Sequence, residues 1–235
     1  MTHSITEAEI TKLARELGTD PSEFAFLAGS SPEAVRTIRY RIAASLDEPH
    51  RPMFRRLARA SALVPVALAA TIATRFFGPM LCGAVASEIA AERAASMIAH
   101  LPMKFVADVT PYVNPRTSGP LIKGIELSIL VPVMTELVER RDLVTISRLV
   151  EAATQDQVQA SAELIEDPAD LLAVYLFAES TESLDAMLAA IDDDRLAAVL
   201  GAAREADLAD VLAEVFSGLS APGRNRVEAV SDRGA

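Results

Sequence analysis

Leucine recurs every 12 residues through the C-terminal part of the chain. One series is Leu172, Leu184, Leu196 and Leu208, and a second, four residues later, is Leu176, Leu188, Leu200 and Leu212. Residues four apart share one face of an α-helix, so each unit predicts a short helix with one apolar stripe. Such a stripe is buried only against neighbouring helices. The spacing therefore predicts stacked short helices over 170–216.

The N-terminal segment carries the start and stop signals of short helices. Asp20 and Ser31 are each followed by a proline, which is the pattern of a capping residue before the first helical position. Gly18 follows an apolar-periodic stretch and marks a helix end. These signals predict a small helical bundle over 1–60. Within it, a helix at 32–45 follows a helix and a turn, which is a helix-turn-helix-like arrangement.

The middle of the chain is its most apolar part, over 61–110. Residues 63–91 are long enough to span a bilayer, but Arg75 stands near their middle and Gly78-Pro79 interrupts them. We therefore predict two helices buried in protein here and no membrane span. With the repeats that follow, 61–235 is predicted to form one helical array.

A proline-rich stretch at 110–120, TPYVNPRTSGP, is predicted to be the longest non-helical connection. Long ordered loops often carry functional residues. Arg116 offers a guanidinium that can bind a carboxylate or phosphate bidentately, and Tyr112 stands close to it in sequence. A long apolar helix is expected to follow over 121–138, with a kink or break at Pro132.

Composition supports an all-α fold. Alanine and leucine, both good helix formers, dominate, tryptophan is absent and aromatic residues make up 5% of the chain. The fold class predicted is all-α, with a short-helix superhelical, solenoid-like array in the C-terminal half and an N-terminal helical bundle before it.

A single cysteine, Cys82, excludes an intramolecular disulfide, and the N-terminus lacks a signal-peptide pattern. We expect a soluble, cytoplasmic protein.

Charge is unevenly distributed along the chain. Residues 1–125 hold 14 Lys/Arg against 11 Asp/Glu, whereas 126–235 hold 8 against 22. The acidic half repels nucleic acid and anionic lipid. Any contact with either is therefore expected from the N-terminal half.

The repeat segment ESLDAMLAAIDDDRLAAVLGAAREADLADVLAEVF, Glu182–Phe216, resembles the cytosolic N-terminal domain of bacterial magnesium transporters. The resemblance extends over about 140–220. It implies a superhelix of short helices with acidic turns. The nucleotide-binding-like repeats and the channel that follow this domain in that family have no counterpart in the sequence. The resemblance therefore implies a fold and no magnesium transport.

No arrangement of residues predicts catalysis, a cofactor or a metal. His3, His50 and His100 follow no metal-ligand spacing, and Cys82 lies among apolar neighbours, which is typical of a buried structural thiol. The run 192–194, three aspartates, lacks the glycine and distal glutamate of a calcium loop and is interpreted as a helix cap. We predict a protein that is not an enzyme.

Two segments are candidate binding sites. Phe76, Phe77 and Met80 belong to the Phe- and Met-rich middle segment, and such residues line adaptable apolar pockets or fill a core. With Tyr112 and Arg116 they are the candidate site for an apolar small molecule in the 63–125 region.

The second candidate site is basic. Arg36, Arg39 and Tyr40 lie on the helix predicted at 32–45, where they could reach base edges in DNA. The alternative is a solvated basic face, or one that docks on the acidic half of the chain.

Three functions remain open from the sequence. The preferred one is a helical-repeat scaffold or regulatory protein that binds a protein partner, because solenoids offer extended concave surfaces. The alternatives are a binding protein for an apolar small molecule and a DNA-binding regulator. A homodimer is also expected to be feasible, because a terminal helix of an array needs a cap.

Overall fold

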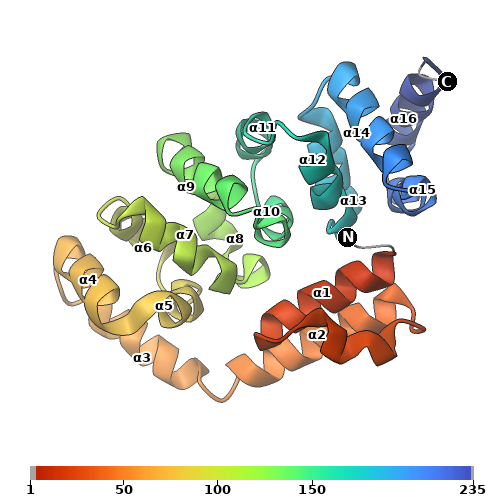
Figure 1. Ribbon diagram of the computed structural model, residues 1–235. Coiled ribbons are helices and arrows are strands. Elements are labelled where there is room, and N and C mark those ends of the chain that lie inside the picture. Colours follow the sequence, from red (N-terminus) through yellow and green to blue (C-terminus); the bar gives the residue numbers. More distant parts are fainter. Residues whose placement is uncertain (1–3, 234–235) are drawn as a thin grey trace. The chain divides into compact units, whose positions relative to one another are not determined.

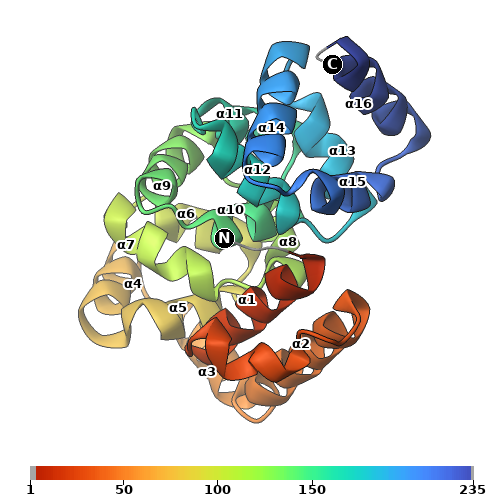
Figure 2. The same ribbon diagram turned by 45° about the vertical axis from the view of Figure 1, so that its right-hand side comes forward.

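The chain is helical throughout the part that the structure, a computed structural model, describes, which is residues 4–233 (Figures 1 and 2). Sixteen α-helices and three shorter helical turns follow one another, and no β-strand occurs within these residues. The all-α prediction is confirmed. Two compact units form: unit 1 comprises Met1–Glu48 with Ile165–Ala235, and unit 2 is Pro49–Leu164.

Unit 1 joins both ends of the chain. Its elements are α1 (Ile5–Leu17), the 3₁₀ turn η1 (Pro21–Leu27), α2 (Pro32–Asp47), α12 (Pro168–Leu176), α13 (Thr181–Ala189), α14 (Asp193–Glu205), α15 (Ala209–Ser217) and α16 (Ala221–Arg233). This grouping does not follow the ranges 1–60 and 61–235 expected from the sequence. The reason is that α1 and α2 bond to the segment after α12, through Glu179.

The repeated leucines fall on successive short helices of unit 1. Leu172, Leu184 and Leu196 lie on α12, α13 and α14, and Leu208 is the N-cap residue of α15. These four are buried, as are three of the four leucines that follow them by four residues. The repeat therefore marks helices whose apolar stripe faces a core.

The N-terminal helices of unit 1 begin and end where the sequence signals predict. Asp20 caps η1 and Ser31 caps α2, each through a side-chain oxygen that accepts a backbone N–H, with proline following. Gly18 ends α1 with φ of 66°, a left-handed conformation that favours glycine. Between α1 and α2, a small core forms from Ile10, Leu13 and Val35.

Unit 2 is built from nine α-helices and two shorter turns in one continuous stretch of chain. They are α3 (Arg51–Ser61), α4 (Val66–Ile72), the π turn η2 (Ala73–Phe77), α5 (Gly78–Ala86), α6 (Ala91–Ile98), α7 (Met103–Val109), the 3₁₀ turn η3 (Thr110–Tyr112), α8 (Pro115–Lys123), α9 (Leu127–Glu139), α10 (Leu143–Val150) and α11 (Gln155–Glu163).

The stretch 110–120 is mostly helical, and the prediction of a long loop there is wrong. Asn114 caps α8 by accepting the backbone N–H of Arg116, and Pro115 occupies the first helical position, where no N–H is needed. Tyr112 ends the turn η3. Pro111 and Pro115 lie at the starts of η3 and α8, whereas Pro120 lies inside α8, so none of the three marks a loop.

The helix expected over 121–138 is divided in a different place from the one predicted. α8 ends at Lys123 and Gly124 caps it, after which α9 begins at Leu127. Pro132 lies inside α9, which continues through it. The boundary therefore falls at Gly124, whose backbone is still right-handed, and not at Pro132.

The apolar run Val66–Ala86 is long and apolar enough to cross a bilayer, and it is the one such run found in residues 4–233. Only 22% of its most apolar window is buried within the protein. The run comprises α4, η2 and α5, with a π turn in the middle and Gly78 at φ 70°. Helices form here as predicted, but the burial expected of them is not found.

Gly83 on α5 allows η3 to approach closely. A Cβ placed on Gly83 would lie 2.5 Å from the Cβ of Tyr112 and 2.8 Å from its backbone carbonyl carbon. The obstacle is partly backbone, so the two elements would have to separate to make room.

Gly83→Ala is expected to lower the free energy of unfolding by about 1–3 kcal/mol, because the added methyl overpacks the contact between α5 and η3. Urea denaturation followed by circular dichroism measures this. Gly119→Ala, in α8 with nothing within 4 Å of the added Cβ, is the control. It should be neutral or stabilise by up to ~1 kcal/mol, because alanine is the better helix former. Equal effects of the two substitutions would contradict the close approach.

Candidate ligand site in the apolar cavity

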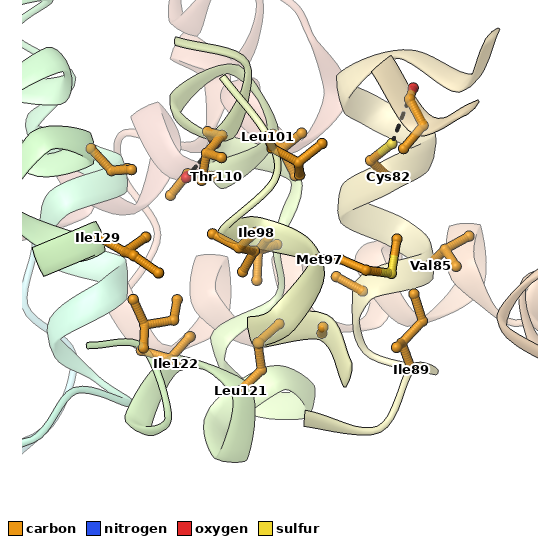
Figure 3. A pocket seen from close by; sticks show the side chains of 18 of the residues that line it. Cys82, Val85, Ile89, Met97, Ile98, Leu101, Thr110, Leu121, Ile122 and Ile129 are labelled. Carbon is orange, nitrogen blue, oxygen red and sulfur yellow. Dashed lines mark hydrogen bonds between the residues drawn. The ribbon is translucent and has the colours of Figure 1, made fainter. Parts of the chain in front are cut away.

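Unit 2 contains an apolar cavity of about 330 Å³ that is partly open to solvent. Every α-helix of the unit, α3 to α11, contributes at least one lining side chain. Figure 3 shows Cys82, Val85 and Ile89 on one side, Ile122 and Ile129 on the other, and Met97 and Ile98 between them. The cavity is therefore built by the whole helical bundle and not by one loop.

The few polar groups in the lining already have partners. Thr110 donates its hydroxyl to Val106 O at 2.8 Å, a bond drawn in Figure 3, and Ser161 donates to Gln157 O at 2.7 Å. Both amide hydrogens of Gln157 are used, on Ile122 O and Ile125 O.

No charged side chain is among the residues that line the cavity. An occupant would therefore be recognised by its shape and apolar surface, not by a charged group.

The cavity is partly open to solvent, and its walls are apolar. Water inside it would find few polar partners, because the lining polar groups use theirs internally. An apolar occupant would release this water and remove apolar wall surface from contact with it, which is worth about 25 cal/mol per Å². The hydrophobic effect therefore favours an apolar occupant.

Cys82 lies on α5 in the cavity wall. Its thiol is half-buried, and Sγ donates to Ala73 O at 3.8 Å, the second dashed bond of Figure 3. Burial raises the pKa of Cys82 to about 11. A thiol with so little thiolate at neutral pH is a poor nucleophile, which agrees with the structural role expected from its apolar neighbours.

Of the five residues proposed from the sequence for an apolar ligand, only Phe77 lines the cavity. Phe76 and Met80 are 76% and 66% exposed, and Tyr112 is also exposed. Arg116 lies at the start of α8, with an exposed side chain. The structure therefore places the cavity in the apolar segment but turns most of the predicted side chains outward.

The residues that sequence reasoning missed lie on both sides of position 120, and those after it form a wall of their own. Leu121, Ile122 and Ile129 complete the far wall, and Val133 and Ile146 extend it along α9 and α10. Their signal in the sequence is the apolar content of 121–138, which we interpreted as one long helix. That helix is divided at Gly124, and both parts face the cavity.

The residues proposed for DNA contact lie in a buried ion cluster of unit 1. Arg39 donates to Glu179 Oε1 at 2.6 Å and to Glu9 Oε2 at 3.3 Å, and its side chain is 4% exposed. Arg36 bonds Glu9 at 2.9 Å. Tyr40 donates its hydroxyl to Glu179. Contacts to DNA bases require side chains that are exposed to solvent. Arg36, Arg39 and Tyr40 bond to carboxylates instead, so the basic face of α2 lies on the inner side of unit 1.

Lys12 completes this ion cluster. Its ammonium group lies 2.6 Å from Glu9 Oε1 and 2.9 Å from Glu179 Oε1, and it also donates to Phe177 O. Burial lowers the pKa of Lys12, while Glu179 and Glu9 oppose that shift. Partial burial alone would raise the pKa of Glu179. However, Lys12 and Arg39, with the hydrogen bonds that Glu179 accepts, outweigh this effect and lower the pKa to about 2.

Residues 4–233 bring no three His, Cys, Asp or Glu side chains together in a metal-binding group. His3 lies outside these residues. In the run 192–194, Asp192 caps α14 by accepting the backbone N–H of Arg195 at 2.8 Å, as interpreted from the sequence.

Comparison with known proteins adds no family to this picture. No family model matches the sequence, and no significant match was found among curated proteins or solved structures. The resemblance of Glu182–Phe216 to the magnesium-transporter domain therefore stays a prediction.

Cys82 is expected to react slowly. With a pKa near 11 and not 9.0, its thiolate fraction at about pH 8 falls roughly a hundredfold. Alkylation by iodoacetamide should be slower by about that factor in the native protein than in the same chain unfolded in urea, as measured by mass spectrometry. Native and unfolded chains that react at similar rates would place Cys82 outside the cavity wall.

The ion cluster is expected to make unit 1 acid-sensitive. The folded pKa of Glu179 lies below its ordinary 4.5, so its contribution to stability is complete above about pH 4.5 and is lost as the pH falls towards 2. Glu179→Gln should lower the free energy of unfolding by about 3 kcal/mol at neutral pH. In urea titrations, the difference in free energy of unfolding between wild type and Glu179→Gln should shrink as the pH falls from 4.5 to 2. Glu182→Gln, an exposed glutamate on α13, is the control. A gap that is independent of pH would contradict this account.

Proposed function

We propose that the protein binds an uncharged, mainly hydrocarbon small molecule in the cavity of unit 2. The observation that carries the proposal is the cavity of about 330 Å³ with no charged lining residue and with its polar groups satisfied internally. Ligand pockets in proteins begin at about this volume. The hydrophobic gain from covering the apolar lining supports the same conclusion.

The size of the cavity limits the ligand. A cavity of ~150 Å³ holds a benzene-sized molecule, so about 330 Å³ has room for roughly 10–14 carbon atoms. A molecule with a buried carboxylate or ammonium is disfavoured, because nothing in the lining would compensate for its desolvation. Linear alcohols, alkanes and fused aromatic hydrocarbons fit this description.

A protein-binding role for unit 1 is the second candidate. Residues 165–235 hold 15 Asp/Glu against five Arg, which favours a basic partner. This proposal includes a superhelical arrangement of the short helices α12–α16. The 12-residue spacing of the leucines and their burial support it. A pull-down at physiological salt that returns no stoichiometric partner would count against it.

The basic helix α2 gives the DNA-binding alternative little support, because Arg36 and Arg39 bond Glu9 and Glu179.

The ligand proposal is tested with the neutral fluorophore 1-aminonaphthalene, whose carbon atoms fit the size limit of the cavity and whose emission rises in an apolar site. Wild-type protein should enhance its fluorescence with a dissociation constant on the order of 1–100 µM, and 1-dodecanol should compete. Dodecanoate at neutral pH should compete less well, because its carboxylate would lose hydration.

The matched variants are Ala94→Leu and Ala99→Leu. Ala94 is buried on α6 and lines the cavity, whereas Ala99, at the end of the same helix, is exposed. Ala94→Leu should weaken probe binding about tenfold or more by filling the space, and Ala99→Leu should leave it unchanged. Lack of enhancement by the wild-type protein, or equal effects of the two substitutions, would overturn the proposal.

A further inference from the structure

One segment of unit 2 reverses the charge of the chain. Residues 49–87 hold five arginines and no aspartate or glutamate, in a protein whose formal net charge is −11. Four of these arginines lie on α3, and Arg75 lies in the π turn η2. The segment is therefore a local cationic region in an acidic protein.

The arginines of α3 lie on the side of the helix that faces away from the cavity. Arg51, Arg55, Arg56 and Arg59 are all exposed. Leu57 and Ser61 of the same helix line the cavity. The apolar side of α3 thus packs against the interior of unit 2, and its arginines form the outer side.

Large apolar side chains project from the same segment into solvent. Leu63, in the turn after α3, is 87% exposed, Phe76 in η2 is 76% exposed, and Met80 on α5 is 66% exposed. Leu68 on α4 is also exposed. All four lie between positions 63 and 80, and several large exposed apolar side chains in so short a segment are candidates for an interaction surface.

Hydrogen bonds from Arg93 hold the turn that carries Leu63 in place. Arg93 on α6 donates to Val64 O at 2.7 Å and also to Ser61 O, the carbonyls on either side of residues 62 and 63. The projection of Leu63 is therefore fixed by hydrogen bonds within unit 2.

One carboxylate neutralises part of the charge. Glu88 accepts from Arg51 and Arg55, at 3.1 Å each. For Arg56, Arg59 and Arg75, no ion pair occurs within residues 4–233. Glu92, exposed on the neighbouring α6, is the other carboxylate close to the segment in sequence. The net charge of 49–92 stays positive, with five arginines and two glutamates.

We propose that this surface, made by the arginines of α3 with Leu63, Leu68, Phe76 and Met80, docks on an anionic phospholipid bilayer. The apolar side chains would enter the interface between headgroups and acyl chains, and the arginines would contact lipid phosphates. This is a peripheral attachment and not a span, because Arg75, the π turn and Gly78 interrupt the apolar run.

A second copy of the chain is the less favoured occupant. In a two-fold symmetric contact each surface meets itself, so the arginines of one copy would face those of the other. An anionic bilayer complements the same charges. The inference goes beyond the proposed ligand binding and does not require it, since its test contains no cavity ligand.

The test is co-sedimentation of the full chain with phosphatidylcholine vesicles that contain or lack a third of phosphatidylglycerol. Wild-type protein should bind the anionic vesicles, and binding should fall at high salt. Arg56→Glu with Arg59→Glu should weaken the partition about thirtyfold or more. Leu63→Ser with Phe76→Ser should weaken it about tenfold or more at either salt concentration.

The controls use exposed residues of unit 1. Arg41→Glu repeats the charge reversal on α2, and Phe26→Ser removes a side chain that is 77% exposed in η1. Both should bind like wild type, after circular dichroism has shown that every variant folds. Absence of binding to anionic vesicles, or equal loss in the controls, would overturn the proposal. So would a dimer in vesicle-free ultracentrifugation that Leu63→Ser with Phe76→Ser dissociates, because the surface would then be a contact between copies.

Discussion

Unit 1 depends on two carboxylates, Glu9 and Glu179, that share three cations in its interior. Glu9 is fully buried and has Lys12, Arg36 and Arg39 within bonding distance, and Glu179 contacts the same side of the cluster. Removing one ionised group of the cluster leaves its partners charged and buried without water. The free-energy cost of this exceeds the net stability that an intact buried ion pair contributes. The packing of α1 and α2 with the C-terminal helices therefore depends on a complete set of ionised groups.

Unit 2 is organised by the opposite chemistry. Its interior is apolar, its polar lining groups bond to their own backbone, and its helices leave space between them. Helix boundaries at Gly78 and Gly124 and the tight contact at Gly83 set the directions in which the short helices run. One unit is thus fixed by directional ionic contacts, while the other is fixed by shape and retains room for a guest.

The sequence predicted the local features that depend on neighbouring residues. The caps at Asp20 and Ser31 and the buried leucines of α12–α15 follow from short-range spacing. Contacts between distant positions were predicted only in outline. A basic face docked on the acidic half was one of the alternatives, and Arg39 does bond Glu179, but the sequence could not name a partner 140 residues away. Phe76 resembled a pocket residue because composition does not say which way a side chain points. The cavity itself depends on how nine helices pack, which no local pattern encodes.

The order of the chain gives the ion cluster a consequence for synthesis. Arg39 leaves the ribosome 140 residues before Glu179, a delay of roughly 7–28 s at ~5–20 residues per second. All of unit 2 is made during that interval, so it can fold while α1 and α2 still lack their partner. Until then Glu9 can pair with Lys12, Arg36 and Arg39, but these cations lack the carboxylate of Glu179. The cluster is complete only when residues from both ends of the chain are present.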